Sequence, residues 1–310
     1  MQQGNSCFRL FARKRMGDMI TGLFKYMAFL SVLMLLGIPV VWGQEVCAHR
    51  GEHLTAPENT IPSIRSAIRE GVRQVEIDVK TTRDGTEVLM HDWTVDRTTN
   101  GSGNVAELTF AEIRMLDAGS WFDISYENIR VPTLQEALAV IPDEVAVNVH
   151  VHGGVGTVVR TAEIIEGTGH LEHCFLTLGM DAYDEMAAAR LAVPSIRICK
   201  GHPADSTVTR EDTLIPADAF EQAGNLTGAE EINRTIDYVQ LFGAYESPEQ
   251  LAETVKALQG LGVTVNFCCA NTADQIIPLI DAGVDYILTD EVKLCKEVLE
   301  MHGNGEGRLK

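Results

Sequence analysis

The stretch that decides the fold begins Cys47-Ala48-His49-Arg50-Gly51 and ends Leu89-Met90-His91-Asp92. Between these ends lie Pro57-Glu58-Asn59-Thr60 and Val75-Glu76-Ile77-Asp78-Val79. The latter alternates apolar and acidic residues with the period of a β-strand, so both carboxylates point to one face. Each end of the stretch joins a short apolar run to a histidine. The stretch therefore predicts strands that bring acids and imidazoles together where they end.

The two acids of the 75–79 run have a physical use on an inward strand face. Hard divalent cations prefer oxygen ligands and can bridge to a phosphate, so Glu76 and Asp78 are candidate metal ligands. The alternative is an edge strand whose acids face water. The histidines favour the first reading, because α/β barrels place their chemistry at the carboxyl ends of strands.

His49 and His91 are candidates for acid–base chemistry. Two imidazoles beside a metal-held phosphodiester can serve as general base and general acid, because histidine titrates near pH ~6.5. Arg50 offers a bidentate fork for phosphate oxygens. A salt bridge from Arg50 to Glu58 or Glu76 is the alternative, and the two roles are compatible.

The order of short motifs resembles the glycerophosphodiester phosphodiesterase family. The motifs are H-R-G at 49–51, P-E-N-T at 57–60, E-I-D-V at 76–79, T-x-D-G at 82–85, H-D at 91–92, R-T-T-N-G at 97–101 and P-T-L at 132–134. The match is dense through residues 46–138, and residues 283–290 resemble the closing strand of the family.

This resemblance implies an irregular (β/α)8 barrel, or TIM barrel, with a small insertion after the second strand. It also implies hydrolysis of glycerophosphodiesters to glycerol 3-phosphate and an alcohol, with one divalent metal ion, Mg or Ca, as cofactor. The roles that it implies are metal ligation by Glu76 and Asp78, acid–base catalysis by His49 and His91, phosphate contact by Arg50 and orientation of the site by Glu58.

The chain departs from the family pattern at several places, among them 148–152, 268–271 and 176–179, where Leu-Thr-Leu-Gly lacks the family's Ser at the end of the fifth strand. Where similar proteins read N-I-E-I-K, with the Glu as a third metal ligand and the Lys toward the substrate, this chain reads Asn148-Val149-His150-Val151-His152. An imidazole ligand at His150 would favour Mn, Fe, Co or Zn over Ca. We expect His152 to meet the phosphate, although a second imidazole ligand is also possible. At 268–271 the family's aromatic-Thr-x-Asn becomes Cys-Cys-Ala-Asn, which removes an aromatic wall.

These departures keep two functions open. The first is a metal-dependent phosphodiesterase whose partner is a small phosphodiester substrate. The second is a protein that binds a phosphodiester or sugar phosphate on the same barrel without turnover. The retained set of histidines, acids and Arg50 favours the enzyme.

The rest of the chain alternates strand-like and helical runs, which predicts a parallel sheet. Thr82-Arg83-Asp84-Gly85 is too short for a crossover helix, so the run at 87–91 should pair antiparallel with 74–80. Residues 92–131 then form an excursion, and a helix begins at Thr133 with Glu136 at capping-box spacing. We predict one barrel domain over residues 44–310.

The net charge restricts the class of ligand, and the N-terminal segment predicts where the protein is located. The net charge of −19 argues against a nucleic-acid ligand. Residues 1–43 join basic residues to an apolar run, which predicts a cleaved signal peptide and export to the periplasm or the extracellular space. A membrane anchor at 26–42 is the alternative, and it would be the only membrane attachment. Without residues 1–43 the charge is −23, from 20 bases and 43 acids.

The seven cysteines show neither a disulfide framework nor a zinc pattern. Four of them, Cys47, Cys174, Cys199 and Cys268, lie in apolar strand-like runs, where cysteine behaves as a small hydrophobic residue. We expect these four to be buried thiols.

Overall fold

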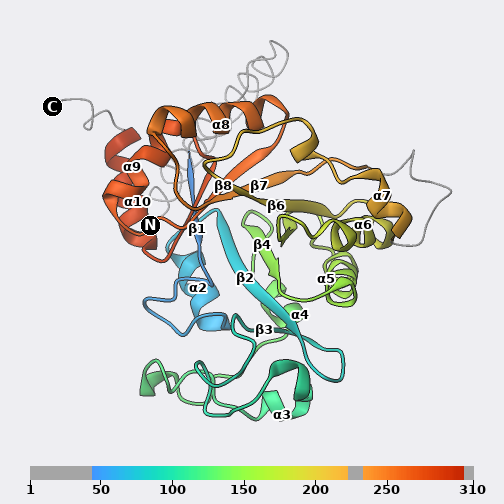
Figure 1. Ribbon diagram of the computed structural model, residues 1–310. Coiled ribbons are helices and arrows are strands. Elements are labelled where there is room, and N and C mark those ends of the chain that lie inside the picture. The colour runs from blue at the N-terminus through green and yellow to red at the C-terminus, as the bar shows by residue number, and fades with distance from the viewer. Residues whose placement is uncertain (1–43, 223–232, 304–310) are drawn as a thin grey trace, which may run out of the picture. The chain divides into compact units, whose positions relative to one another are not determined.

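The computed structural model describes residues 44–222 and 233–303, so the predicted leader at 1–43 lies outside the described residues (Figure 1). Eight parallel strands form a closed ring in the order β1-β9-β8-β7-β6-β5-β4-β2, and pairing of β1 with β2 closes it. One further strand, β3, lies outside the ring and pairs antiparallel with β2. This confirms the predicted barrel and its hairpin strand. The strands are β1 Glu45–Ala48, β2 Gln74–Thr81, β3 Glu87–Leu89, β4 Ala146–Val151, β5 Cys174–Leu178, β6 Arg197–Pro203, β7 Tyr238–Phe242, β8 Thr264–Cys268 and β9 Tyr286–Thr289.

Helices follow most strands and cover the outside of the ring (Figure 1). The α-helices are α2 Ile61–Arg69, α3 Phe110–Arg114, α4 Leu134–Leu138, α5 Val155–Gly167, α6 Tyr183–Ala192, α7 Ala217–Gln222, α8 Pro248–Gly260, α9 Ala273–Ala282 and α10 Val292–Gly303. Three short 3-10 turns are η1 Val105–Glu107, η2 Ile124–Tyr126 and η3 Glu211–Thr213.

Capping side chains explain where helices α4 and α2 begin. The capping box predicted at Thr133 and Glu136 opens α4. Helix α2 starts in the same way, but its N-cap is Thr60, whose hydroxyl accepts from the Ser63 amide. Asn59, directly before this cap, bonds through its side chain to Asp78 on β2.

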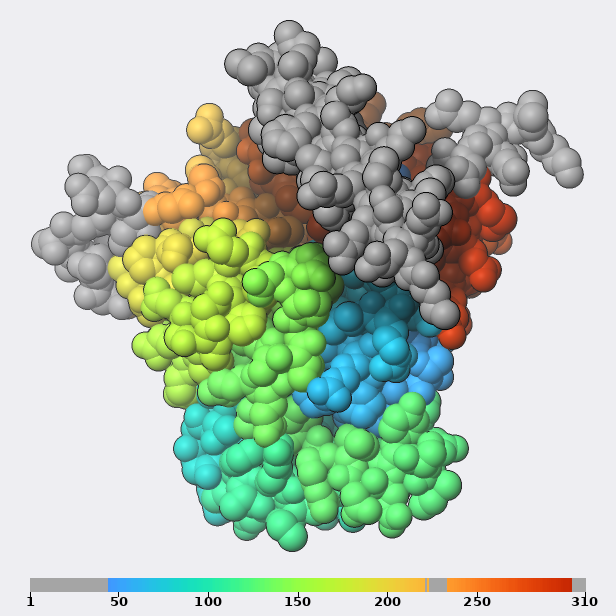
Figure 2. All heavy atoms as spheres, turned by 180° about the vertical axis from the view of Figure 1, so that it is seen from behind, coloured from blue at the N-terminus to red at the C-terminus, as the bar shows by residue number. Residues whose placement is uncertain are grey.

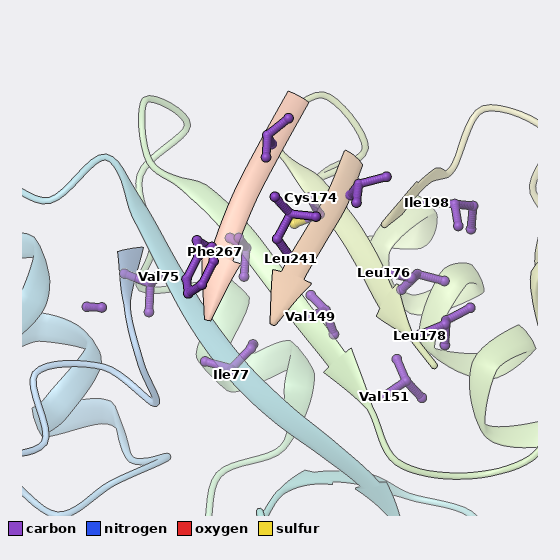
Figure 3. Close-up of a cluster of buried hydrophobic side chains, with 14 of the residues drawn as sticks. Val75, Ile77, Val149, Val151, Cys174, Leu176, Leu178, Ile198, Leu241 and Phe267 are labelled. Carbon is purple, nitrogen blue, oxygen red and sulfur yellow. The ribbon is translucent and has the colours of Figure 1, made fainter. Parts of the chain in front are cut away.

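The main core lies between the ring and its helices. On β2 the side chains of Val75, Ile77 and Val79 are fully buried in it, and Figure 3 shows Ile77 and Val149 of the adjacent strand β4 in this layer. Burial of each such side chain stabilises the fold by about 1.5–3 kcal/mol. Because side chains alternate along a strand, this outward apolar face forces the intervening polar residues into the barrel.

Amide side chains fill the barrel below its carboxyl end. Asn266 donates to Gln74 at 3.1 Å, and Asn148 donates to Gln240 at 3.1 Å. These bonds join strands on different sides of the ring, so they form a rigid polar layer below the carboxyl end of the barrel.

The excursion of residues 92–131 carries η1, α3 and η2, and Figures 1 and 2 show it as a layer at one end of the barrel. It has its own small core, built around Val95, Val105 and Ile113. The Asp117 carboxylate accepts backbone N–H groups of Gly119, Ser120 and Asn128. Burial alone would raise the pKa of Asp117, but these donors hold it well below its usual value.

The prediction for Cys268 is wrong, because Cys268 and its neighbour Cys269 are joined by a disulfide and both are only partly buried. Nothing in the spacing pattern indicates a bond between adjacent residues. Cys47, Cys174, Cys199 and Cys295 are buried free thiols. Within the described ranges, no helix is long and apolar enough to span a bilayer.

Candidate active site

The end of β1 turns sharply at the H-R-G motif. Arg50 and Gly51 have left-handed backbone angles, with φ of 56° and 80°. A Cβ on Gly51 would lie 2.6 Å from the carbonyl carbon of Ser63 in α2, so only glycine fits there. The turn aims the Arg50 amide at Glu76 Oε2, 2.9 Å away, which ties β1 to the acid pair on β2.

His49 is held by a carboxylate from the other end of the chain. Its Nδ1 lies 2.6 Å from Oδ1 of Asp290, just after β9, and Asn271 donates to Oδ2 of Asp290 at 2.6 Å. The hydrogen bond from His49 lowers the pKa of Asp290. An ionised Asp290 can only accept in this bond, so Nδ1 of His49 carries a proton. His53 also contacts Asp290, with Nε2 at 3.1 Å.

His91 has a comparable partner in its neighbour Asp92, with Nδ1 2.7 Å from Oδ1. Arg97 also binds Asp92 through two nitrogens, at 2.7 and 2.9 Å. The hydrogen bonds from Arg97, opposed by burial and joined by the bond from His91, hold the pKa of Asp92 well below its usual range. Both histidines thus have a carboxylate on Nδ1.

Glu58 lies between two guanidinium groups. Its carboxylate accepts from Arg50 at 2.9 Å and from Arg97 at 2.7 and 2.8 Å. Burial opposes ionisation, but Arg97 and Arg50 together lower the pKa of Glu58. Glu58 therefore orients the two arginines, and the Arg50–Glu58 salt bridge predicted as an alternative is present.

Asp78 is the centre of the site. Asn59 donates to its Oδ2 at 2.8 Å and accepts from its backbone N–H at 3.0 Å. His152 Nε2 lies 2.7 Å from Asp78 Oδ1, and His150 Nδ1 lies 3.5 Å from the same oxygen. Burial would raise the pKa of Asp78, but the bonds to His150 and His152 lower it well below its usual value.

The group fits a divalent metal ion. Ligand atoms of Asp78, His150 and His152 all lie within 4.8 Å of one another. Glu76 Oε1 is buried without a hydrogen-bond partner and lies 3.8 Å from His150 Nδ1. Burial and then the charge of Asp78 raise the pKa of Glu76, which a cation would reverse. Burial also lowers the pKa of His152, despite Asp78, and so favours the neutral imidazole that a metal requires.

The residues predicted for the site come from β2, from β4 and the residue after it, and from the segments that follow β1 and β3. Of the predicted metal set Glu76, Asp78 and His150, the group of mutually close ligand atoms contains Asp78 and His150; its third member is His152, which we had assigned to the substrate, and Glu76 lies beside it. Whether each residue has its predicted role stays a prediction. Residues that sequence reasoning did not assign are Asp290, Asp92, Arg97, Asn271, His53 and Lys80. Asp92 and Arg97 lay inside motifs quoted for the resemblance, but no local signal pairs Asp290 with His49.

Fold and site together define a (β/α)8-barrel protein whose strand ends carry a candidate metal centre and two imidazole–carboxylate pairs. This chain belongs to the glycerophosphoryl diester phosphodiesterase family, whose sequence model matches residues 49–294.

Individual relatives agree with this placement. The chain is 44% identical over 111 residues to a glycerophosphodiester phosphodiesterase of Caldanaerobacter subterraneus subsp. tengcongensis, an alignment that covers 36% of this chain and 46% of the relative. It is 48% identical over 94 residues to glycerophosphodiester phosphodiesterase 1 of Bos taurus, covering 30% and 28%. These alignments thus span less than half the length of either curated relative.

A solved structure covers more of the chain. An Oleispira antarctica phosphodiesterase, in complex with the product sn-glycerol-3-phosphate, is 25% identical with a TM-score of 0.64. The match covers 83% of this chain and 96% of that one.

Proposed function

We propose that this protein hydrolyses glycerophosphodiesters to glycerol 3-phosphate and an alcohol. One observation carries the proposal: His49 and His91, each bound through Nδ1 to a carboxylate, follow β1 and β3, and both of these strands pair with β2, which carries Asp78 of the candidate metal group. Family membership and the product-bound relative support the substrate class.

The chain's own residues supply the proton transfers. In this hydrolysis a P–O bond to water forms and the P–O bond to the alcohol breaks. One imidazole takes a proton from the attacking water at Nε2, and the other returns a proton to the leaving alkoxide. Asp290 and Asp92 keep the protons on Nδ1, so neither ring has to change tautomer first. Arg50, oriented by Glu58, can contact phosphate oxygens from the β1 turn.

We propose that Asp78, His150 and His152, with Glu76 beside them, hold one divalent ion. Two imidazoles with carboxylates are typical of sites for Mn, Co or Zn, whereas Mg and Ca prefer oxygen ligands. When bound, the ion would polarise a phosphoryl oxygen and offset its charge.

The test is turnover of glycerophosphocholine, glycerophosphoethanolamine and glycerophosphoinositol by the 44–310 chain with Mg, Ca, Mn, Co or Zn. We expect release of glycerol 3-phosphate with at least one metal. Binding of these diesters without release in any metal would reject the proposal and favour the non-catalytic binding protein.

We also propose that residues 1–43 direct export and are then removed. The support is the basic segment followed by an apolar run in the sequence. N-terminal sequencing of the protein from an expressing bacterial culture would test this, and an intact Met1 in the purified protein would refute it.

A further inference from the structure

Lys80 is the last of four polar residues that alternate with apolar residues along β2. Gln74, Glu76, Asp78 and Lys80 lie two residues apart and so share the inward face of the strand. Val79 on β2 pairs with Val151 on β4. The backbone N–H of His152 donates to the Val79 carbonyl at 2.9 Å, which extends this strand pairing by one residue. Lys80 therefore lies beside His152 at the mouth of the barrel.

The ammonium group of Lys80 is buried and has no hydrogen-bond acceptor. The residue is only 2% exposed, and its Nζ is among the buried side-chain atoms without a partner. A buried ammonium without compensation is costly, so such a group in a native fold requires an explanation. Its position next to the candidate site indicates a functional one.

The ammonium group of Lys80 lies over an aromatic ring. Nζ lies 4.1 Å from the ring centroid of Trp93, which follows the H-D motif and is 60% exposed. A cation–π contact holds the ammonium in place without using an oxygen acceptor. The N–H donors of Lys80 are thus used by no acceptor in the described part of the chain.

The neighbouring charges are already paired. Arg50 binds Glu58 and contacts Asp78 at 3.4 Å, and Arg97 binds Glu58 and Asp92. Burial lowers the pKa of Lys80 to about 8, although the charges of Asp78 and Asp92 act to raise it, and neither carboxylate is hydrogen-bonded to Lys80. Of these three cations, only Lys80 has no carboxylate partner in the described part of the chain.

We propose that Lys80 is the cation that binds the phosphate group of the substrate and of its phosphomonoester product. This inference rests on the proposed function and names a substrate-binding residue for it. The incoming phosphate supplies the oxygen acceptors that the ammonium lacks, and it carries one negative charge as a diester and up to two as a monoester. Lys80 should therefore bind the product more strongly than the diester.

The experiment compares Lys80→Met with the wild-type chain, each loaded with the metal that gives most turnover. Binding of sn-glycerol 3-phosphate and of inorganic phosphate is measured by calorimetry at pH 7, and turnover is measured separately. We expect Lys80→Met to weaken binding of both anions by about 10- to 100-fold and Lys80→Arg to restore most of it, because charged hydrogen bonds are lost and then replaced. Affinity for the metal should not fall, since the lost charge is positive.

Lys200→Met is the matched control. Lys200 on β6 is equally buried, but its ammonium donates to the Tyr183 hydroxyl and the Asp212 carbonyl. We expect this variant to bind phosphate as the wild type does. If Lys80→Met does not fold, Lys80→Gln, which stays polar without the charge, takes its place.

The outcomes separate the two proposals. A wild type that hydrolyses diesters, with Lys80→Met and Lys80→Gln binding both anions as the wild type does, would overturn the role of Lys80 alone. A wild type that neither hydrolyses diesters nor binds the phosphomonoester would overturn the proposed function and Lys80 with it.

Discussion

Single side chains in the site depend on partners that fix their orientation. His49 and Asp290 are 241 residues apart in sequence, yet their side chains meet at 2.6 Å. Asn271 binds the far oxygen of Asp290, so the carboxylate cannot rotate away. Activity at this scale should therefore depend on the partners as well as on the histidines.

Replacing either His49 or His91 should remove most activity. We expect His49→Ala or His91→Ala to lower kcat by about 100-fold or more, because each removes a proton-transfer group. Steady-state kinetics give the rate, and calorimetry should show metal affinity close to that of the wild type. Near-normal turnover by His49→Ala would disprove its assignment.

Asp290→Asn should keep the fold but disturb the tautomer of His49. An amide can present N–H to Nδ1, which moves the proton to Nε2, so we expect kcat to fall by about 10- to 100-fold with little change in KM. Nitrogen chemical shifts of His49 should report the changed tautomer. Asp281→Asn is the control, because Asp281 makes a similar pair with His302 at 2.9 Å on the surface. Equal rates for both variants would contradict the role of Asp290.

His150 should set the choice of metal. We expect His150→Glu to shift binding from Mn, Co or Zn toward Mg or Ca, since a carboxylate restores a hard oxygen ligand. Calorimetric titration of each ion into the variant and the wild type measures this, with His170→Glu, at a histidine that lies just before β5 and outside the candidate metal group, as a control. An unchanged order of metal affinities would show that His150 is not a ligand.

At the scale of elements, the excursion of residues 92–131 determines where His91 and its partners lie. It begins directly after β3 and carries Asp92 and Arg97, and the buried Asp117 ties its second half together. Its small core is separate from the main one. The excursion should therefore respond to changes that leave the barrel intact.

Asp117→Asn should destabilise the protein at neutral pH. The pKa of Asp117 is lowered in the fold, so its contribution is present above the unfolded value of about 4 and is lost as pH falls through the folded value. We expect a lower melting temperature than wild type at pH 7 and a difference that shrinks below pH ~4.

Thermal unfolding across this pH range tests that prediction. Asp96→Asn serves as the control, because Asp96 accepts one backbone bond, from Gly103, in the same excursion. If the difference in melting temperature between the wild type and Asp117→Asn stays constant from pH 7 to strong acid, the prediction is wrong.

At the scale of the whole molecule, the excess of acidic residues determines which groups can attract an anionic substrate. A charge of −19 does not attract an anionic substrate. Local cations must therefore hold it, and the fold places Arg50, Arg97 and Lys80 around the acids at the barrel mouth.

Metal binding should stabilise the whole fold. Relief of repulsion between Glu76 and Asp78 and mass action both favour the folded state. At 100 times the dissociation constant we expect the melting temperature to rise by about 5–10 °C, from about 2.7 kcal/mol of binding. Scanning calorimetry with and without a chelator measures the shift, and the Glu76→Gln, Asp78→Asn double variant should lose it. A chelator without effect on the wild type would count against the metal centre.

The sequence by itself determined the elements and most of the site. Strand alternation, capping residues such as Thr133 and the short 82–85 link act over a few residues, so local physics sets them. Those patterns predicted the parallel sheet and the hairpin strand, and the family resemblance implied the closed ring and the end at which His49, Glu76, Asp78, His91 and His150 lie.

Only the tertiary structure decided which side chains meet. The pairing of Asp290 with His49, the contact of His152 with Asp78 and the lack of an acceptor for Lys80 arise from closing the ring. Closure brings residues from distant strands within hydrogen-bond reach, and their pairing depends on register and rotamer. No local pattern encodes such contacts, because their free energy exists only once the barrel has formed.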